Sequence, residues 1–114
     1  MVQNGQSRTD LLIENDVPIL RAREVMSLDD ATSPCRRIYF AIQLMYVDPD
    51  RITDHQRLYW DLVREVLDAS PSMTARVTAI NARISDGHYY PALKLGRKLI
   101  AYEEELIGHA QSSR

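Results

Sequence analysis

The spacing of the apolar residues changes near Asp29, and this change limits what the 114-residue chain can fold into. Before Asp29, short apolar runs alternate with turn residues, a pattern typical of strands. After it, apolar residues recur every three or four positions, as on one face of a helix. We therefore predict a single α+β domain that is mostly α. A short β element over residues 1–28 precedes a bundle of about four helices over residues 29–107, and residues 108–114 form a frayed tail.

The predicted β element begins with a turn signal. Asn4 and Gly5 both tolerate the positive φ of a type I′ hairpin turn. Residues 7–14 then carry an apolar run, and Ile19 with Leu20 could form a further strand. Only three residues precede the turn, too few for a first arm. We expect either a start codon assigned downstream of the true one or a sheet edge completed by another chain.

The first helix is predicted from Pro34 to about Val47. Ser33 can cap it, and proline is tolerated at the first helical position because its missing N–H needs no partner there. The inward face is expected to comprise Ile38, Ala41, Ile42 and Met45. The opposite side is also apolar, through Phe40, Leu44 and Val47. A helix that is apolar nearly all round is usually central or buried against a partner, so these last three residues predict a homodimer or another protein contact.

Two further helices follow. Thr53 and Gln56 form a capping-box pattern, which predicts a helix over residues 54–69. Another helix is predicted from Pro71 to the turn at Gly87, where glycine supplies the left-handed conformation that ends a helix. The positions expected to face inward are Leu58, Leu62, Val63, Val66 and Leu67 on one helix, and Met73, Val77, Ile80 and Ile84 on the other.

A fourth helix is predicted with Pro91 in its first turn and its end near Ile107. Gly96 lies inside this helix, where glycine costs about 1 kcal/mol relative to alanine. We therefore expect another helix to approach closely at Gly96. The expected inward positions are Leu93, Leu99, Ile100, Leu106 and Ile107.

The charge balance excludes a global attraction to nucleic acid. The formal net charge is −2 and the pI is about 5.9, so any RNA binding must come from a local patch. No apolar run approaches the length of a membrane helix, and the single Cys35 cannot form an internal disulfide. We expect a cytoplasmic protein that does not contact a membrane.

The sequence contains no recognisable catalytic or metal-binding pattern. His55, His88 and His109 lie in different predicted elements without metal-ligand spacing. Cys35 is placed at a helix N-terminus, which can lower a thiol pKa, but no histidine lies near it in sequence. The acidic run 103–105 is interpreted as a solvated face. We therefore predict a protein that is not an enzyme and needs neither a metal nor another cofactor.

Several segments resemble the FlbT family of bacterial flagellar regulators. The quoted segments are Leu-Leu-Ile-Glu-Asn at 11–15, Ile-Leu-Arg at 19–21, Ala-Thr-Ser-Pro-Cys-Arg-Arg-Ile-Tyr-Phe-Ala at 31–41, Leu-Met-Tyr-Val-Asp-Pro at 44–49, Gly-His-Tyr-Tyr-Pro-Ala-Leu-Lys at 87–94 and Arg-Lys-Leu-Ile-Ala-Tyr-Glu at 97–103. The resemblance covers nearly the whole chain, although residues 53–83 match only in pattern. The family normally carries a further N-terminal segment with more strand, which this sequence lacks.

The resemblance implies a post-transcriptional regulator of flagellum biogenesis. Members of the family associate with the 5′ untranslated leader of flagellin mRNA and promote its degradation or repress its translation, although in some relatives the effect is positive. A second small protein, FlaF, acts in the same pathway. The alternative is a protein-interaction module that binds flagellin or FlaF and affects the mRNA only indirectly.

Two groups of residues are candidates for RNA contact. On the first helix, Arg36, Tyr39, Gln43 and Tyr46 share one face, with Arg37 beside them. Arginine, tyrosine and amide side chains can stack on single-stranded bases and hydrogen-bond to them, but tyrosines at this spacing are also common at the rim of a core. On the fourth helix, the candidates are Lys94, Arg97 and Lys98. Their alternative role is a solvated face paired with acids of a neighbour.

Overall fold

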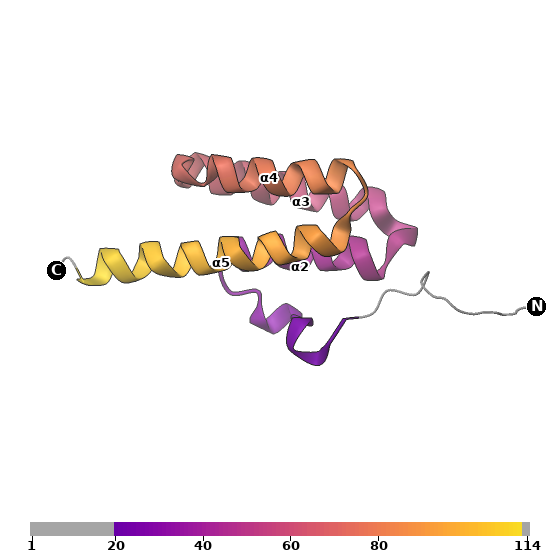
Figure 1. Ribbon diagram of the computed structural model, residues 1–114, viewed down its shortest axis with the longest axis horizontal. Helices are drawn as coiled ribbons and strands as arrows, with labels where there is room; N and C mark the ends of the chain where they lie inside the picture. The colour runs from indigo at the N-terminus through magenta and orange to yellow at the C-terminus, as the bar shows by residue number, and fades with distance from the viewer. Residues whose placement is uncertain (1–19, 113–114) are drawn as a thin grey trace, which may run out of the picture.

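The computed structural model describes residues 20–112, and within them it forms four α-helices and four short 3₁₀ turns (Figure 1). The helices are α2 (Pro34–Val47), α3 (Ile52–Ala69), α4 (Thr74–Ser85) and α5 (Tyr89–Ser112). The 3₁₀ turns are η1 (Ala22–Glu24), η2 (Leu28–Asp30), η3 (Pro49–Arg51) and η4 (Pro71–Met73). Among these residues, no helix is long and apolar enough to cross a membrane.

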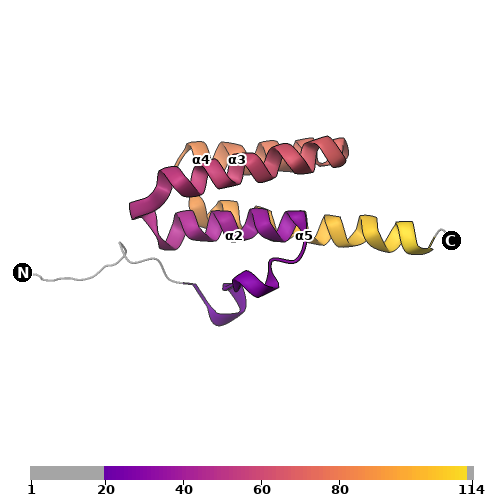
Figure 2. The ribbon, with the colours of Figure 1, turned by 180° about the vertical axis from the view of Figure 1, so that it is seen from behind.

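The helices form two layers, α3 with α4 and α2 with α5, as both ribbon views show (Figures 1 and 2). Helix α2 packs against α3 and α5, and α4 packs against α5. The C-terminal part of α5 projects beyond the other helices (Figure 2). The segment that contains η1 and η2 crosses the face of the α2–α5 layer that points away from α3 and α4.

The core lies between the two layers and follows most of the predicted pattern. The predicted inward residues of α2 and of η4–α4 are all buried: Ile38, Ala41, Ile42, Met45, Met73, Val77, Ile80 and Ile84. On α3 the prediction was wrong at one position. Leu58 is 40% exposed while Tyr59 is fully buried, because the Tyr59 hydroxyl donates a hydrogen bond to Asn81 Oδ1 on α4 at 2.5 Å and so satisfies its polar group inside the fold.

The helix ends confirm the capping arguments in part. Ser33 caps α2, since its Oγ accepts a hydrogen bond from the Arg36 N–H at 3.2 Å. Gly87 has a φ of 78° and closes the turn after α4, as predicted. The predicted cap at Thr53 was wrong. Helix α3 begins at Ile52, two residues before the predicted start, and directly follows the 3₁₀ turn that starts at Pro49.

Helix α5 confirms the close contact predicted at Gly96. A Cβ built there would lie 3.3 Å from Tyr39 Cδ2 and 3.5 Å from Ile42 Cδ1, so the absence of a side chain lets α2 and α5 approach each other. The helix continues past Gly108 to Ser112, rather than ending near Ile107 as predicted.

The predicted N-terminal β element was wrong. Within residues 20–112 the structure contains no strand, and residues 21–30, which we call the strap, fold into η1 and η2. The backbone of the strap bonds to side chains of α2 instead of a second strand: Gln43 accepts from the Met26 N–H and donates to the Met26 carbonyl, both at 2.8 Å. The predicted turn at Asn4 and the run over residues 7–14 lie outside the described residues.

Candidate functional site

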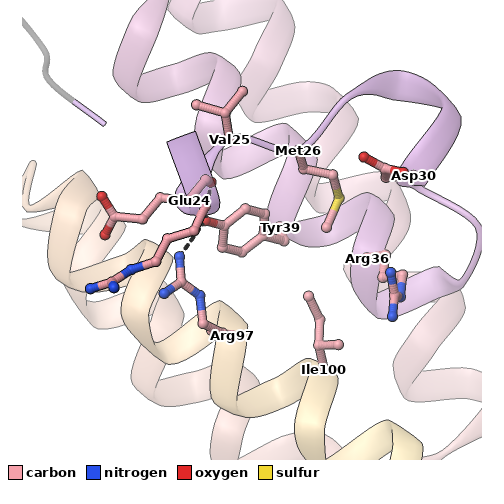
Figure 3. A pocket seen from close by; sticks show the side chains of 9 residues that line it. Glu24, Val25, Met26, Asp30, Arg36, Tyr39, Arg97 and Ile100 are labelled. Atoms are coloured by element: carbon pink, nitrogen blue, oxygen red, sulfur yellow. Dashed lines mark hydrogen bonds between the residues drawn. The ribbon is translucent and has the colours of Figure 1, made fainter. Parts of the chain in front are cut away.

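The strap is fixed to the bundle by a hydrogen-bonded chain through Tyr39. The Tyr39 hydroxyl donates to the Glu24 carbonyl at 2.6 Å, and it accepts from the Arg97 guanidinium of α5 at 3.0 Å. Arg97 also lies 5.7 Å from the centroid of the Tyr39 ring. Figure 3 shows the Tyr39 ring under the strap, with Arg97 reaching it from α5. Three segments distant in sequence therefore meet at one tyrosine.

The Glu24 carboxylate forms a second tie between the strap and α5. It accepts a hydrogen bond from the Tyr90 hydroxyl at 2.5 Å and another from the Arg21 N–H at 2.8 Å. These bonds, together with the nearby charges of Arg97 and Arg21, hold the pKa of Glu24 below its ordinary value. The same contact raises the pKa of Tyr90. Glu24 therefore stays ionised and keeps the strap in place at neutral pH.

A basic hollow of about 500 Å³ opens between the strap and α5. Its lining contains five cationic side chains and one carboxylate, that of Glu24. The cationic residues are Arg21, Arg23, Lys94, Arg97 and Lys98. Within the described residues, none of the five forms an ion pair. Five cations face one carboxylate, so the lining keeps a net positive charge that can attract an anionic ligand.

A smaller hollow of about 200 Å³ adjoins the basic hollow and shares Arg23, Glu24 and Arg97 with it (Figure 3). Arg36 lines its far side. The Arg36 guanidinium is already paired with the carboxylate of Glu104 at 2.9 Å. The positive charge of this smaller hollow is therefore partly compensated within the chain.

The structure brings the three predicted cations of α5 together. Lys94, Arg97 and Lys98 all line the basic hollow, and Lys94 Nζ lies 5.1 Å from the centroid of the Tyr90 ring. The sequence did not reveal the other wall, which the strap supplies through Arg21 and Arg23. The alternating cations of residues 21–23 are visible in the sequence, but the apolar spacing around them predicts a β element.

The residues of α2 that were predicted to contact RNA lie in different environments. Tyr39 is only 3% exposed and Gln43 is buried, so neither presents its flat face to a base. Both are used to hold the strap. Tyr46 is half-buried, with its ring 5.9 Å from that of Tyr90. Arg37 lies apart from the basic hollow, in a small apolar hollow between α2 and α3.

Of the three residues predicted for self-association, Phe40 lines this apolar hollow of about 170 Å³, and Leu44 and Val47 do not. Phe40 lines it together with Leu28, Leu58 and Leu62, and Phe40 is itself half-buried. Leu44 is also half-buried, and Val47 is 44% exposed. Helix α3 thus covers part of the second apolar side of α2, while Leu28 remains 72% exposed.

Cys35 is buried at the start of α2, next to Met73 at 3.6 Å between the sulfur atoms. Burial, together with the nearby Glu103 carboxylate, raises the pKa of the Cys35 thiol to about 12. This is opposite to the lowered pKa of a reactive cysteine. Across residues 20–112, no group of three or more histidine, cysteine or acidic residues is arranged to hold a metal ion.

Comparisons with known proteins point in one direction. The family model "Flagellar protein FlbT" matches residues 1–107. "Probable flagellum biosynthesis repressor protein FlbT 1" of Bradyrhizobium diazoefficiens is 43% identical, over 99% of this chain and 77% of its own length. "Probable flagellum biosynthesis repressor protein FlbT" of Rhodopseudomonas palustris is 37% identical, over 94% and 84%.

A third relative has the same name without the qualifier. "Flagellum biosynthesis repressor protein FlbT" of Caulobacter vibrioides is 34% identical, over 98% of this chain and 81% of its own length. No solved structure gives a significant match to the chain.

Proposed function

The chain belongs to the FlbT family of flagellar proteins, and from this membership we propose that it regulates flagellum biosynthesis by binding the 5′ untranslated leader of flagellin mRNA. Several relatives are named as repressors of flagellum biosynthesis. These names favour repression over activation. We propose that the repression acts at the leader, by degradation of the message or by reduced translation. An mRNA target implies that the protein acts in the cytoplasm, and the role requires no catalysis.

The observation that carries the proposal is the basic hollow. Five cations surround one space between the strap and α5, without an ion pair to any described carboxylate. RNA carries one negative phosphate per nucleotide, and neutralising phosphates supplies most of the sequence-independent affinity of nucleic-acid-binding proteins. A chain with a net charge of −2 that gathers cations in one place supports a local phosphate site rather than a general attraction to polyanions.

A direct titration tests this function. Purified protein is titrated with labelled flagellin-leader RNA at physiological salt, and in parallel with an RNA of equal length and base composition but scrambled sequence. We expect the leader to bind more tightly than the scrambled RNA. Phosphate contacts alone do not distinguish sequences, so this difference would measure the contribution of contacts to bases. The absence of binding to either RNA would remove the proposed function.

The apolar hollow between α2 and α3 favours a second candidate, a module that binds protein rather than RNA. Leu28 and Leu58 are exposed beside the half-buried Phe40, and exposed apolar groups that lie together often mark a protein contact. Flagellin, FlaF or a second copy of the chain are the partners proposed for this surface. The same titration with flagellin or FlaF in place of RNA, and sedimentation of the protein alone, would distinguish them.

A further inference from the structure

The basic hollow has cations on two opposing walls. Arg21 and Arg23 belong to the strap, while Lys94, Arg97 and Lys98 belong to α5. A phosphate that enters between the walls meets positive charge from both sides. The arginine guanidinium can donate two parallel hydrogen bonds to one phosphate, and such bonds would fix the path of the backbone between the walls.

The strap also limits what can enter the hollow. It is held in place by Glu24, Tyr39 and Gln43, and it crosses the outer face of the α2–α5 layer (Figures 1 and 2). The hollow is open to solvent, and its volume of about 500 Å³ is in the range of small-ligand pockets. An A-form duplex is recognised across a wide, shallow groove and several base pairs. A single strand can thread between two walls, whereas a duplex has to rest on top of them.

One aromatic ring lines the hollow, and a second ring packs against the first. Tyr90 lines the hollow, and the ring of Tyr46 packs against it with the centroids 5.9 Å apart and the planes tilted by 42°. Both side chains are half-buried. Within the described residues, the Tyr46 hydroxyl forms no hydrogen bond that would hold the ring in its present position. A base released from a duplex can stack on such a ring, whereas a paired base cannot.

We propose that the hollow is a clamp for one strand of RNA, with backbone phosphates between the strap and α5 and an unpaired base on the Tyr46–Tyr90 pair. This rests on the proposed function and adds to it a substrate class and a role for the strap. Arg21 and Arg23 contact phosphate. Glu24 and Tyr39 are positioning residues, which hold the strap at the right distance from α5.

The strand preference is tested with one labelled oligonucleotide taken from an unpaired part of the leader, free or annealed to its complement. The clamp predicts that the duplex binds at least about tenfold more weakly than the single strand at the same salt concentration. Equal affinity for the two forms would overturn the clamp while leaving RNA binding intact. Failure of both forms to bind would overturn the clamp together with the proposed function.

The aromatic pair of the clamp is tested by a variant with a matched control. Tyr46→Leu keeps an apolar side chain and should weaken single-strand binding at least about fivefold, because stacking is lost. Tyr102→Leu is the control: Tyr102 is also half-buried and has Arg76 stacked 3.7 Å from its ring centroid. Tyr46 packs against Tyr90, which lines the hollow, whereas Arg76 does not line it. Equal losses in the two variants would contradict a stacking role for Tyr46.

For the strap, Arg21→Ala with Arg23→Ala leaves the Arg21 N–H bond to Glu24 in place, since that donor is in the backbone. The clamp predicts that single-strand affinity falls while the weak duplex affinity changes much less. The preference for single strands should therefore shrink. A uniform loss for both forms would show that these arginines supply charge only, and would overturn their role as a wall of the clamp.

Discussion

Glu103, a residue of α5, packs against the N-terminus of α2. Its carboxylate accepts hydrogen bonds there from the Ser33 hydroxyl at 2.5 Å and from the Cys35 N–H at 3.2 Å. It is only 7% exposed. The acidic run 103–105 was expected to be a solvated face, and for Glu103 this was wrong. The error has a physical cause: the unpaired N–H groups and the positive dipole at the start of α2 attract a carboxylate, and the sequence does not show that α5 carries one there.

We predict that Glu103→Ala destabilises the fold by about 1–3 kcal/mol, because it leaves the Cys35 N–H buried without its partner. Glu105→Ala is the matched control, since Glu105 is exposed and should change stability by no more than about 0.5 kcal/mol. Urea unfolding followed by circular dichroism measures both. Equal effects from the two substitutions would show that Glu103 does not stabilise the N-terminus of α2.

At the scale of elements, local signals predicted the helices well. Ser33 and Pro34 gave the start of α2, and Gly87 gave the turn after α4, because each acts through its own backbone or its nearest neighbours. The strap could not be predicted in this way. Its course depends on Glu24, whose carboxylate bonds to Tyr90, 66 positions later. The strand-like spacing of this segment does not determine its structure, because its contacts with α2 and α5 exist only after the helices have packed.

Contact between α2 and α5 depends on Gly96. We predict that Gly96→Val destabilises the fold by about 1–3 kcal/mol, because the first added carbon would lie 3.3 Å from Tyr39 Cδ2 and the further methyl groups have no room. Gly108→Val is the control on the same helix, since a Cβ there would meet nothing within 4 Å. Thermal unfolding of both variants measures the difference. A stable Gly96→Val protein would contradict the close approach of the two helices.

Across the whole molecule, charge is the property that the sequence describes least well. The net charge of −2 disfavours RNA binding when it is taken as an average. Folding brings residues 21–23 next to residues 94–98 and concentrates five cations around one hollow. The sequence predicted the α5 half of this site, because those cations are neighbours on one helix. It did not predict the strap half, because the spatial proximity of the two segments is a tertiary property.

The measurement that tests this account most directly is the salt dependence of leader-RNA binding by a double variant, Arg97→Ala with Lys98→Ala. If both side chains neutralise phosphates of single-stranded RNA, the slope of log affinity against log salt should become shallower by about 0.7 unit per lost contact, and affinity should drop for all RNA sequences alike. The control is Arg57→Ala with Arg83→Ala, which removes two exposed arginines that do not line the hollow. The account predicts a slope reduced by about 1.4 in the first variant and unchanged in the second. An unchanged slope in the first variant, or the same reduction in both, would contradict it.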